Sequence, residues 1–539
     1  FWPESYGCGQ KRIYQKQCED ICKWDCTEVK MAVTVQGVSE LLQMVLYFQC
    51  HFIIPKSKQV HAYKEAMMMI TGAELFVKAL KAEQVDTLFA YPGGQAIDLF
   101  NALYGEQDID VILPRHEQGL VHAADGYARS TGKVGVCLVT SGPGAANLVT
   151  GIATANYDSV PLVCFTGQVP TGLIGNDAFQ EVDIVGITRS ICKYAVTVRK
   201  REELAAVIRK AFLISRTGKP GVVVVDLPKD IQREYGSDDY PEEIEIRGYK
   251  PKLSVHPGQL KKALETLNHA KKPVFLVGGG VNISHAHSEM LKLAEMTGVP
   301  VVTTIMGKGA IPTTHDLYIG NLGIHGSYAA NTAISHCDVL FSIGTRFNDR
   351  ITGKTGHFAT HAAIIHIDID PASISRNIEV DIPIVADAKT ALLALLEKAQ
   401  KLDTEEWLEQ IRQWKSQYPL SMKTEGLTPE KVIRAINHTF DNAIIATDVG
   451  QNQLWATQFL ELSEKKQMLT SGGLGTMGYG FPAAIGAQIG NPLKDVIVIS
   501  GDGGMQMNIQ EMATAICYEL PITICILNNG YLGNVRQWQ

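Results

Sequence analysis

The sequence of 539 residues has few charged side chains and no long apolar or basic run. Charged residues make up 19% of the chain and the net charge is −7, so no nucleic-acid-binding surface is indicated. The apolar run at 41–54 is interrupted by polar side chains and is too short to cross a membrane. No secretory signal or organelle transit peptide is recognisable. We therefore expect a cytoplasmic protein that binds neither nucleic acid nor membrane.

The cysteines form neither a disulfide framework nor a zinc motif. Five of the 11 cysteines lie in the first 50 residues, and the others are scattered, mostly in apolar strand-like runs. Their spacing matches no zinc pattern. Reduced, buried thiols in a cytosolic protein explain this distribution. The segment 1–66 begins with Phe instead of Met and is interpreted as an N-terminal extension of unassigned function.

Beyond residue 66, helical patterns alternate with apolar β-rich runs, which is typical of parallel α/β sheets. We predict three doubly wound parallel-sheet domains, at 67–232, 257–398 and 425–539, with a polar linker at 232–257. The third domain has fewer elements than a doubly wound domain needs, so we expect it to be incomplete at its C-terminus. The predicted strands include Thr87–Tyr91, Val134–Thr140, Leu162–Thr166, Gly221–Asp226, Pro273–Val277, Val301–Thr304, Val339–Ile343, Ile364–Asp368, Ala443–Asp448, Val496–Ser500 and Ile522–Leu527.

Two oxygen-bearing side chains each follow a predicted strand near the C-terminus. Asp502 lies in a Gly-Asp-Gly triplet, and Asn529 lies 27 positions further on. Parallel strands end at one sheet edge, where α/β folds bind ligands, and these two oxygens suit Mg²⁺. Gly503 and Gly504 would admit an anion, and a helix predicted over about 508–519 would face a phosphate. The triplet alone is common in turns, but the whole arrangement resembles the diphosphate motif of thiamine diphosphate (ThDP) enzymes.

Glu117 begins a helix of small residues after a strand-like run. A carboxylate there is expected to be partly buried, which favours its neutral form and raises its pKa. Taken alone, it could equally be a solvated acid at a helix start. ThDP enzymes need a glutamate that hydrogen-bonds the aminopyrimidine ring and favours the imino tautomer that creates the ylid. Beside the diphosphate motif, Glu117 fits that role.

Several further motifs occur in the same order as in one ThDP family. Residues 70–539 resemble acetohydroxyacid synthase, also called acetolactate synthase, in its catalytic subunit. Each motif is moderate evidence alone, and the set is specific. The motifs are Arg115–Gly119, Thr140–Gly144, Phe165–Pro170, Asp177–Glu181, Asp226–Asp230, Gly278–Gly280, Arg346–Arg350, Thr470–Gly478 and Tyr531–Gln539.

The resemblance implies roles for the cofactor-facing residues. Glu117 corresponds to the ylid-forming acid. Asp502 and Asn529 correspond to the side-chain Mg²⁺ ligands, with the Tyr531 carbonyl as a third ligand. Met477 corresponds to the apolar wedge that bends ThDP. The further ThDP contacts are Gly475, Gly503 and Gly504.

The resemblance also implies substrate-facing residues. Gln180 corresponds to a residue that faces the cofactor and reactants, with Phe179 beside it, and Lys229 to an active-site lysine. Trp538 corresponds to the residue that favours 2-ketobutyrate as second substrate, an effect of ~1–3 kcal/mol from covering one methyl group. From the residues alone, Met477 could be ordinary packing, Lys229 a surface lysine and Trp538 a core anchor.

The central domain carries a flavin signal. Gly278 and Gly279 follow a predicted strand, where glycine permits close approach of a phosphate. The resemblance assigns these glycines, with Arg350, Asp368 and Asp387, to FAD binding. A glycine run alone is a weak signal, but the motif ending at Arg350 favours the flavin-bearing branch of the family. The implied net reaction is not redox, so FAD would be structural.

The resemblance implies a transferase of branched-chain amino-acid (valine, leucine, isoleucine) biosynthesis. It would join pyruvate, with loss of CO₂, to a second pyruvate or to 2-ketobutyrate, giving 2-acetolactate or 2-aceto-2-hydroxybutyrate. The family builds its site between two subunits, which implies a homodimer or tetramer, with a small regulatory subunit as a further partner. The alternatives are another ThDP 2-ketoacid enzyme, such as pyruvate oxidase or the catabolic synthase, and an inactive cofactor-binding fragment.

Overall fold

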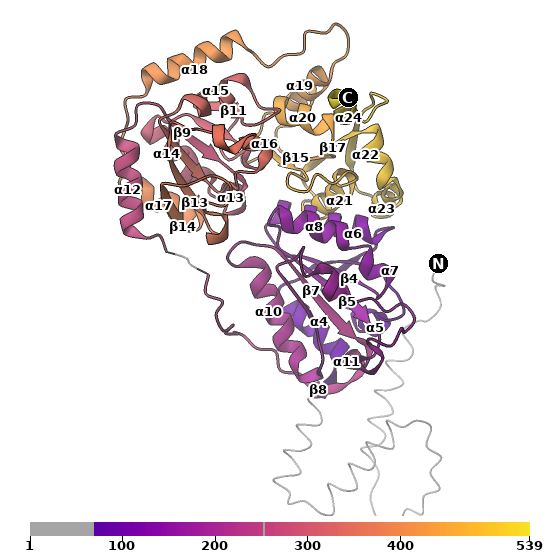
Figure 1. The fold of residues 1–539 in the computed structure, drawn as a ribbon. Coiled ribbons are helices and arrows are strands. Elements are labelled where there is room, and N and C mark those ends of the chain that lie inside the picture. The colour runs from indigo at the N-terminus through magenta and orange to yellow at the C-terminus, as the bar shows by residue number, and fades with distance from the viewer. Residues whose placement is uncertain (1–68, 252–253) are drawn as a thin grey trace, which may run out of the picture. The chain divides into compact units, whose positions relative to one another are not determined.

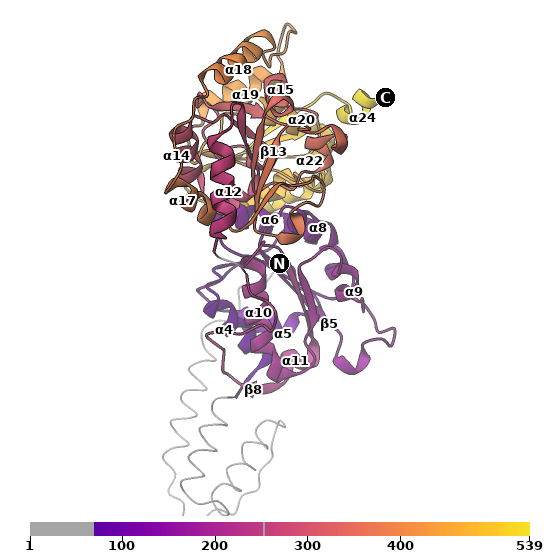
Figure 2. The same ribbon diagram turned by 60° about the vertical axis from the view of Figure 1, so that its left-hand side comes forward.

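The computed structural model describes residues 69–251 and 254–539. The expected N-terminal extension, 1–66, lies outside the described residues. The segment Ile70–Gln539 forms one compact unit with three parallel sheets (Figures 1 and 2), which confirms the predicted α/β fold class. Among the described residues, every helix is too short or too polar to span a bilayer.

The first sheet has six parallel strands in the order β3-β2-β4-β5-β7-β6. Its region contains β1 (Met69–Thr71), α4 (Gly72–Ala82), β2 (Thr87–Ala90), α5 (Ile97–Leu103), β3 (Asp110–Ile112), α6 (Glu117–Thr131), β4 (Gly135–Val139), α7 (Pro143–Ala146), α8 (Val149–Tyr157), β5 (Leu162–Gln168), α9 (Ile184–Thr188), β6 (Tyr194–Thr197), α10 (Leu204–Arg216), β7 (Val222–Pro228), α11 (Lys229–Arg233) and β8 (Tyr235–Ser237). Successive strand residues point to opposite faces. Val223 and Val225 therefore pack with α4, α5 and α10, whereas Val222 and Val224 pack with α6 and α8. The segment interpreted as a linker contains β8, which pairs with β1.

The second sheet also has six parallel strands, in the order β11-β10-β9-β12-β13-β14. Its region contains α12 (Pro257–Asn268), β9 (Pro273–Val277), α13 (Gly279–Ile283), α14 (His287–Thr297), β10 (Val301–Thr303), β11 (Tyr318–Asn321), α15 (Tyr328–His336), β12 (Val339–Ile343), α16 (Asp349–Thr352), β13 (Ala363–Asp368), β14 (Ile382–Val385), α17 (Ala388–Leu396) and α18 (Glu405–Gln417). Phe341 packs with α12, α14 and α17 on one face, and Leu340 packs with α15 and α18 on the other.

The third sheet has four parallel strands in the order β16-β15-β17-β18. Its region contains α19 (Pro429–Thr439), β15 (Ala443–Thr447), α20 (Gln451–Phe459), β16 (Gln467–Leu469), α21 (Gly480–Gly490), β17 (Asp495–Gly501), α22 (Asp502–Met507), α23 (Met512–Cys517), β18 (Ile522–Leu527) and α24 (Gly533–Trp538). Ile445 packs with α19 and α20, and Ile444 packs with α21.

The helix expected over about 508–519 was placed too late in the chain. The helical segment starts at Asp502 as α22, passes through a 3-10 turn at Ile509–Glu511, and resumes as α23. Glycine is a poor helix former, so this start was hard to predict from the sequence. Close packing of Gly504 against Asp448 and an acidic residue in the first turn favour it.

Helices α6 and α21 cross at a distance that only glycine allows. A Cβ atom on Gly126 would lie 2.0 Å from the carbonyl oxygen of Ala483, and one on Gly486 would lie 1.7 Å from that of Ala123. The backbones of the two helices therefore touch directly. Because α6 belongs to the first sheet region and α21 to the third, this crossing joins the two regions.

Candidate active site

The residues predicted to hold Mg²⁺ follow two neighbouring strands. Strands β17 and β18 are parallel, with Gly501 opposite Leu527, so Asp502 and Asn529 lie at the same sheet edge. The Asn529 amide nitrogen donates to Gln451 Oε1 at 3.0 Å, and its Oδ1 accepts from the backbone N–H of Tyr531 at 3.0 Å. An ion at this edge would compete with Tyr531 N–H for the Asn529 oxygen.

The donor set at this edge fits a hard cation. It offers the carboxylate of Asp502 and the amide oxygen of Asn529, which are oxygen donors of the kind that Mg²⁺ takes. Within residues 69–251 and 254–539, no group of three or more His, Cys, Asp or Glu side chains forms a metal site by itself. Magnesium bound here would therefore depend on further oxygens from water or a diphosphate.

Met477 lies in a loop that approaches the start of α22. A Cβ atom on Gly503 would lie 3.7 Å from Met477 Cε and 3.4 Å from a methyl carbon of Leu532. Gly475, two residues before Met477, adopts a left-handed backbone conformation with φ of 72°. The structure thus brings Met477 beside Gly503 and leaves Gly475 free of close contacts.

A buried carboxylate that the sequence analysis did not single out holds this loop. Asp448 follows β15 and accepts hydrogen bonds from the backbone N–H groups of Val449, Gly478 and Gly480 at 2.8–3.1 Å. Burial raises its pKa, although these three hydrogen bonds act in the opposite direction. A Cβ atom on Gly504 would lie 2.2 Å from Asp448 Oδ1, so glycine is required there. The position of Asp448 at the end of a predicted strand was the available signal in the sequence.

Glu117 is the first residue of α6 and is half-buried, as its place in the sequence predicted. The side-chain amide of Asn147 donates to Glu117 Oε2 at 3.0 Å. A Cβ atom on Gly144 would lie 3.4 Å from Glu117 Oε1. The preceding His116 caps the helix by accepting from the backbone N–H of Gln118 at 3.0 Å. The acid is therefore fixed by a side-chain amide on one side and by a capped helix start on the other.

The proposed substrate-facing residues are not brought together by hydrogen bonds in the described structure. Phe179 is 84% exposed and Gln180 is also exposed, with a left-handed φ of 59°. Lys229 begins α11, and its ammonium donates to the Gly94 carbonyl at 2.6 Å. Trp538 ends α24 and is 71% exposed, so it is not a core anchor in the described structure.

The residues predicted for FAD gather at the carboxyl edge of the second sheet. Gly278 follows β9, the motif ending at Arg350 follows β12, Asp368 ends β13 and Asp387 follows β14. These four strands are neighbours in the sheet. The carboxyl ends of parallel strands form the usual ligand-binding crevice.

The residues predicted to bind FAD make different kinds of local contact at this edge. A Cβ atom on Gly278 would lie 2.2 Å from the Gly344 carbonyl oxygen, and one on Gly279 would lie 3.0 Å from the side chain of Met306. Burial raises the pKa of Asp368 to about 6. Asp387 caps α17 by accepting from the Thr390 N–H at 3.0 Å, which is a structural role. Arg350 is exposed. The two glycines allow close packing against Gly344 and Met306, and the exposed guanidinium of Arg350 is the group at this edge that fits a phosphate-bearing ligand.

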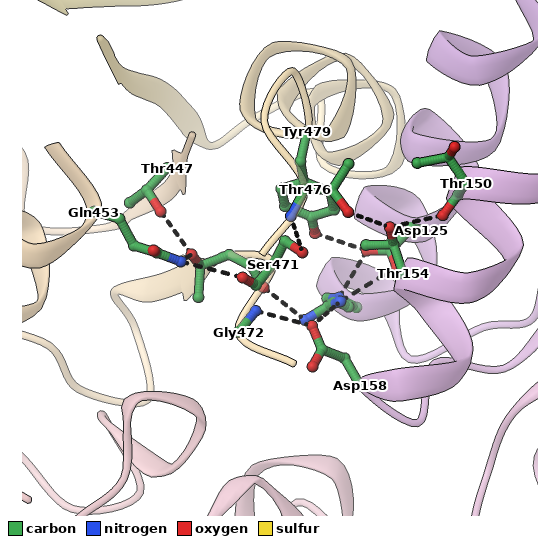
Figure 3. Close-up of polar contacts among 12 residues, drawn as sticks. Asp125, Thr150, Thr154, Asp158, Thr447, Gln453, Ser471, Gly472, Thr476 and Tyr479 are labelled. Atoms are coloured by element: carbon green, nitrogen blue, oxygen red, sulfur yellow. Dashed lines mark hydrogen bonds and ion pairs between the residues drawn. The ribbon is translucent and has the colours of Figure 1, made fainter. Parts of the chain in front are cut away.

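A buried ion-pair network joins α6 and α8 to the loop that carries Met477 (Figure 3). Arg129 binds Asp125 at 2.7 Å and Asp158 at 3.0 Å, and it also donates to the Thr470 carbonyl at 3.1 Å. Asp158 accepts from the Gly472 N–H at 3.1 Å. Asp125 and Arg129 are four residues apart on α6, a spacing that allows an ion pair, but neither this pair nor its contact with the distant loop was predicted from the sequence.

The comparisons with known proteins define the class first. Three family models match, described as the N-terminal TPP binding domain (residues 70–187), the central domain (260–395) and the C-terminal TPP binding domain (448–539) of thiamine pyrophosphate enzymes. Thiamine pyrophosphate is ThDP. The chain is thus built as an enzyme of the ThDP class, with a ThDP-binding domain on each side of a central domain.

The relatives narrow the class to one family. The chain is 50% identical over 483 residues to the probable acetolactate synthase large subunit of Methanocaldococcus jannaschii, covering 87% of this chain and 82% of that protein. It is 46% identical to acetolactate synthase isozyme 3 large subunit of Escherichia coli, covering 88% and 84%. With the Corynebacterium glutamicum large subunit the identity is 46%, covering 87% and 76%. The chain belongs to the acetolactate synthase large-subunit family.

Proposed function

We propose that this chain is the catalytic subunit of an acetolactate synthase. It joins pyruvate, with loss of CO₂, to a second pyruvate or to 2-ketobutyrate, and so makes 2-acetolactate or 2-aceto-2-hydroxybutyrate for branched-chain amino-acid biosynthesis. The observation that carries this proposal is the 46–50% identity to acetolactate synthase large subunits over nearly nine tenths of the chain. The strand-end pair Asp502 and Asn529 gives it a structural basis.

The residues proposed to bind Mg²⁺ and the diphosphate lie at one edge of the third sheet. Asp502, Asn529 and the Tyr531 carbonyl would hold Mg²⁺, and the backbone at Gly503 and Gly504 would face the diphosphate. When bound, ThDP supplies a carbon centre that stabilises the carbanion of a decarboxylated 2-ketoacid. The chain's own contribution is to bind the cofactor, bend it and exchange protons with it.

Met477 would bend the cofactor, and Glu117 would exchange protons with it. Asn147 donates to Glu117 Oε2, which leaves Oε1 to hold and release the proton exchanged with the cofactor. Met477 would press an apolar side chain against the cofactor, with Gly475 providing the backbone turn. Glu117 and Asp502 lie in different domains, and we infer a homodimer or tetramer whose site combines domains from two subunits.

The substrate and flavin residues complete the proposal. Gln180, Phe179, Lys229 and Trp538 would contact the ketoacids, with the indole of Trp538 covering the extra methyl group of 2-ketobutyrate. FAD would bind structurally at the edge of the second sheet. Its proposed contacts are Gly278, Gly279, Arg350, Asp368 and Asp387.

The family also suggests partners and a compartment. The relatives are named large subunits, and we infer a small regulatory subunit as partner. All six cysteines of the described residues are free thiols, which suits the reducing cytoplasm.

The test is the formation of acetolactate from pyruvate, with FAD present and with ThDP and Mg²⁺ added or withheld. We expect activity only with both ThDP and Mg²⁺. Glu117→Gln should lower it by roughly 10²–10⁴-fold, the usual value of a proton-transfer group. Asp502→Asn should raise the Mg²⁺ concentration that half-saturates activity. Glu265→Gln, at an exposed ion pair on α12, is the control. Undiminished activity of Glu117→Gln would overturn the proposal.

A further inference from the structure

Glu511 is a carboxylate of the third domain that is only 1% exposed. It follows the Gly-Asp-Gly segment by a few residues and lies in the 3-10 turn between α22 and α23. We propose that Glu511 is a positioning residue that fixes the start of α6 and thereby the carboxylate of Glu117. This inference rests on the proposed function of Glu117.

The carboxylate of Glu511 receives its hydrogen bonds from the turn just before Glu117. The backbone N–H of His116 donates to Oε1 at 3.0 Å, and that of Arg115 donates to both oxygens at 3.0 and 3.1 Å. The hydroxyl of Thr514 donates to Oε2 at 2.6 Å. Both oxygens of this buried acid are therefore satisfied, as buried polar groups normally are.

The local backbone is shaped to admit this carboxylate. A Cβ atom on Gly119 would lie 2.4 Å from Glu511 Oε1, and its three nearest neighbours would all be Glu511 side-chain atoms. The positive end of the α6 dipole also favours a negative charge at this place. Gly119 and the amides of Arg115 and His116 thus form a socket for one distant side chain.

Glu511 acts on the position of Glu117 through the backbone. His116 is its chain neighbour, so the two amides held by Glu511 set the backbone from which the Glu117 side chain projects. Without Glu511, two backbone donors lose their partner, and the turn can relax to recover hydrogen bonds with water. A shift of about 1 Å in a catalytic group can cost on the order of 100-fold in rate. Glu511 does not itself touch Glu117 in any hydrogen bond of the described structure.

The main experiment measures exchange of the C2 proton of bound ThDP for deuterium by quenched-flow NMR. This step reports the action of Glu117 without substrate. We expect Glu511→Ala to slow it by about 100-fold and Glu511→Gln, which keeps one acceptor oxygen, to slow it less. Tyr518→Phe is the matched control, because Tyr518 accepts from the nearby Leu113 N–H at 2.8 Å but not from the turn itself. It should exchange at nearly the parent rate.

A double-variant cycle tests the socket. Gly119→Ala should slow C2 exchange in the parent protein, because its methyl group displaces the Glu511 carboxylate. In the Glu511→Ala background the same methyl group meets no carboxylate, so we expect less than about a 3-fold further effect. If the two effects multiply independently, the inference is wrong.

Hydrogen exchange of the apoprotein gives a readout that does not need the cofactor. In Glu511→Ala, amides 115 and 116 should lose protection while α12 keeps it. If Glu511→Ala does not fold, Glu511→Gln and Gly119→Ala carry the same test. Parent-like C2 exchange in these variants, with Glu117→Gln inactive, overturns this inference alone. Parent-like exchange in Glu117→Gln overturns the proposed function.

Discussion

The hydroxyl oxygens of Thr154 and Thr476 lie 2.7 Å apart in a buried contact between α8 and the loop before α21. Thr476 precedes Met477 directly. On the other side of Met477, the Tyr479 hydroxyl donates to Asp125 Oδ1 at 2.7 Å, as Figure 3 shows. The proposed cofactor wedge is therefore held from both sides by helices of the first domain.

Thr154→Val tests the first of these contacts. The substitution keeps the shape of the side chain but leaves the buried Thr476 hydroxyl without its partner. We expect the free energy of unfolding to fall by about 1–3 kcal/mol, measured by urea titration of the apoprotein. Thr154→Ser keeps the hydroxyl and should retain more stability. If Thr154→Val, which keeps the methyl group, is as stable as the parent while Thr154→Ser is destabilised, packing of the methyl group and not the hydrogen bond matters.

Much of the fold could be predicted because buried parallel strands are short apolar runs. The bounds of β9, β12 and β18 agree with the predicted runs to the residue. The shared edge of Asp502 and Asn529 followed from the rule that parallel strands end together. The start of α22 was missed because glycine-rich segments have low helix propensity, and tertiary packing of Gly504 overrode it.

The supporting residues of the site could not be predicted in the same way. Glu511 and Arg129 each contact backbone groups far away in the chain. A carbonyl or an N–H group carries no sequence signal, since every residue other than proline has both. Side chains that act by holding distant backbone therefore become visible only in three dimensions.

Arg129→Met tests the network that joins the two ThDP-binding domains. Burial alone would lower the pKa of Arg129, but Asp125, Tyr479 and Asp158 raise it well above its ordinary value. Removing the cation leaves two carboxylates in the interior, so we expect a loss of about 3–5 kcal/mol in the free energy of unfolding. Arg129→Lys keeps the charge but not the forked geometry and should lose less. Thermal and urea unfolding measure the stability of both variants. If Arg129→Met loses no more unfolding free energy than Arg129→Lys, the ionic role of Arg129 is contradicted.

His122 should make the free energy of unfolding fall at acidic pH. The side chain is buried, and neither ring nitrogen has a hydrogen-bond partner among the described residues. Burial, and then the charge of Arg129, lower its pKa to about 3. Below the unfolded-state pKa of about 6.5 the unfolded chain binds a proton that the folded chain does not, so stability falls as the pH drops from about 6.5 towards 3.

His122→Phe removes this titrating group. The difference in unfolding free energy between the parent and the variant should be constant above about pH 7.5 and should shift by about 2 kcal/mol in favour of the variant at pH 5. Urea unfolding at a series of pH values measures it. Parallel stability curves for the two proteins would show that His122 is not the group responsible.

Gly126→Ala tests the crossing of α6 and α21. Alanine is the better helix former by about 1 kcal/mol, so an isolated helix would gain stability. Here the added methyl group would lie 2.0 Å from the Ala483 carbonyl oxygen, a backbone atom that cannot move without shifting α21. Overpacking of this kind costs about 1–3 kcal/mol, so we expect a net loss.

The control for that variant is Gly356→Ala, because a Cβ atom there would meet nothing within 4 Å. Its free energy of unfolding should stay within about 0.5 kcal/mol of the parent, as for most surface substitutions. Since α6 carries Glu117 at its start and α21 follows the Met477 loop, the strain in Gly126→Ala should also weaken ThDP binding, measured by titration of the apoprotein. A stable Gly126→Ala protein with parent-like ThDP affinity would show that the helices can separate without disturbing either residue.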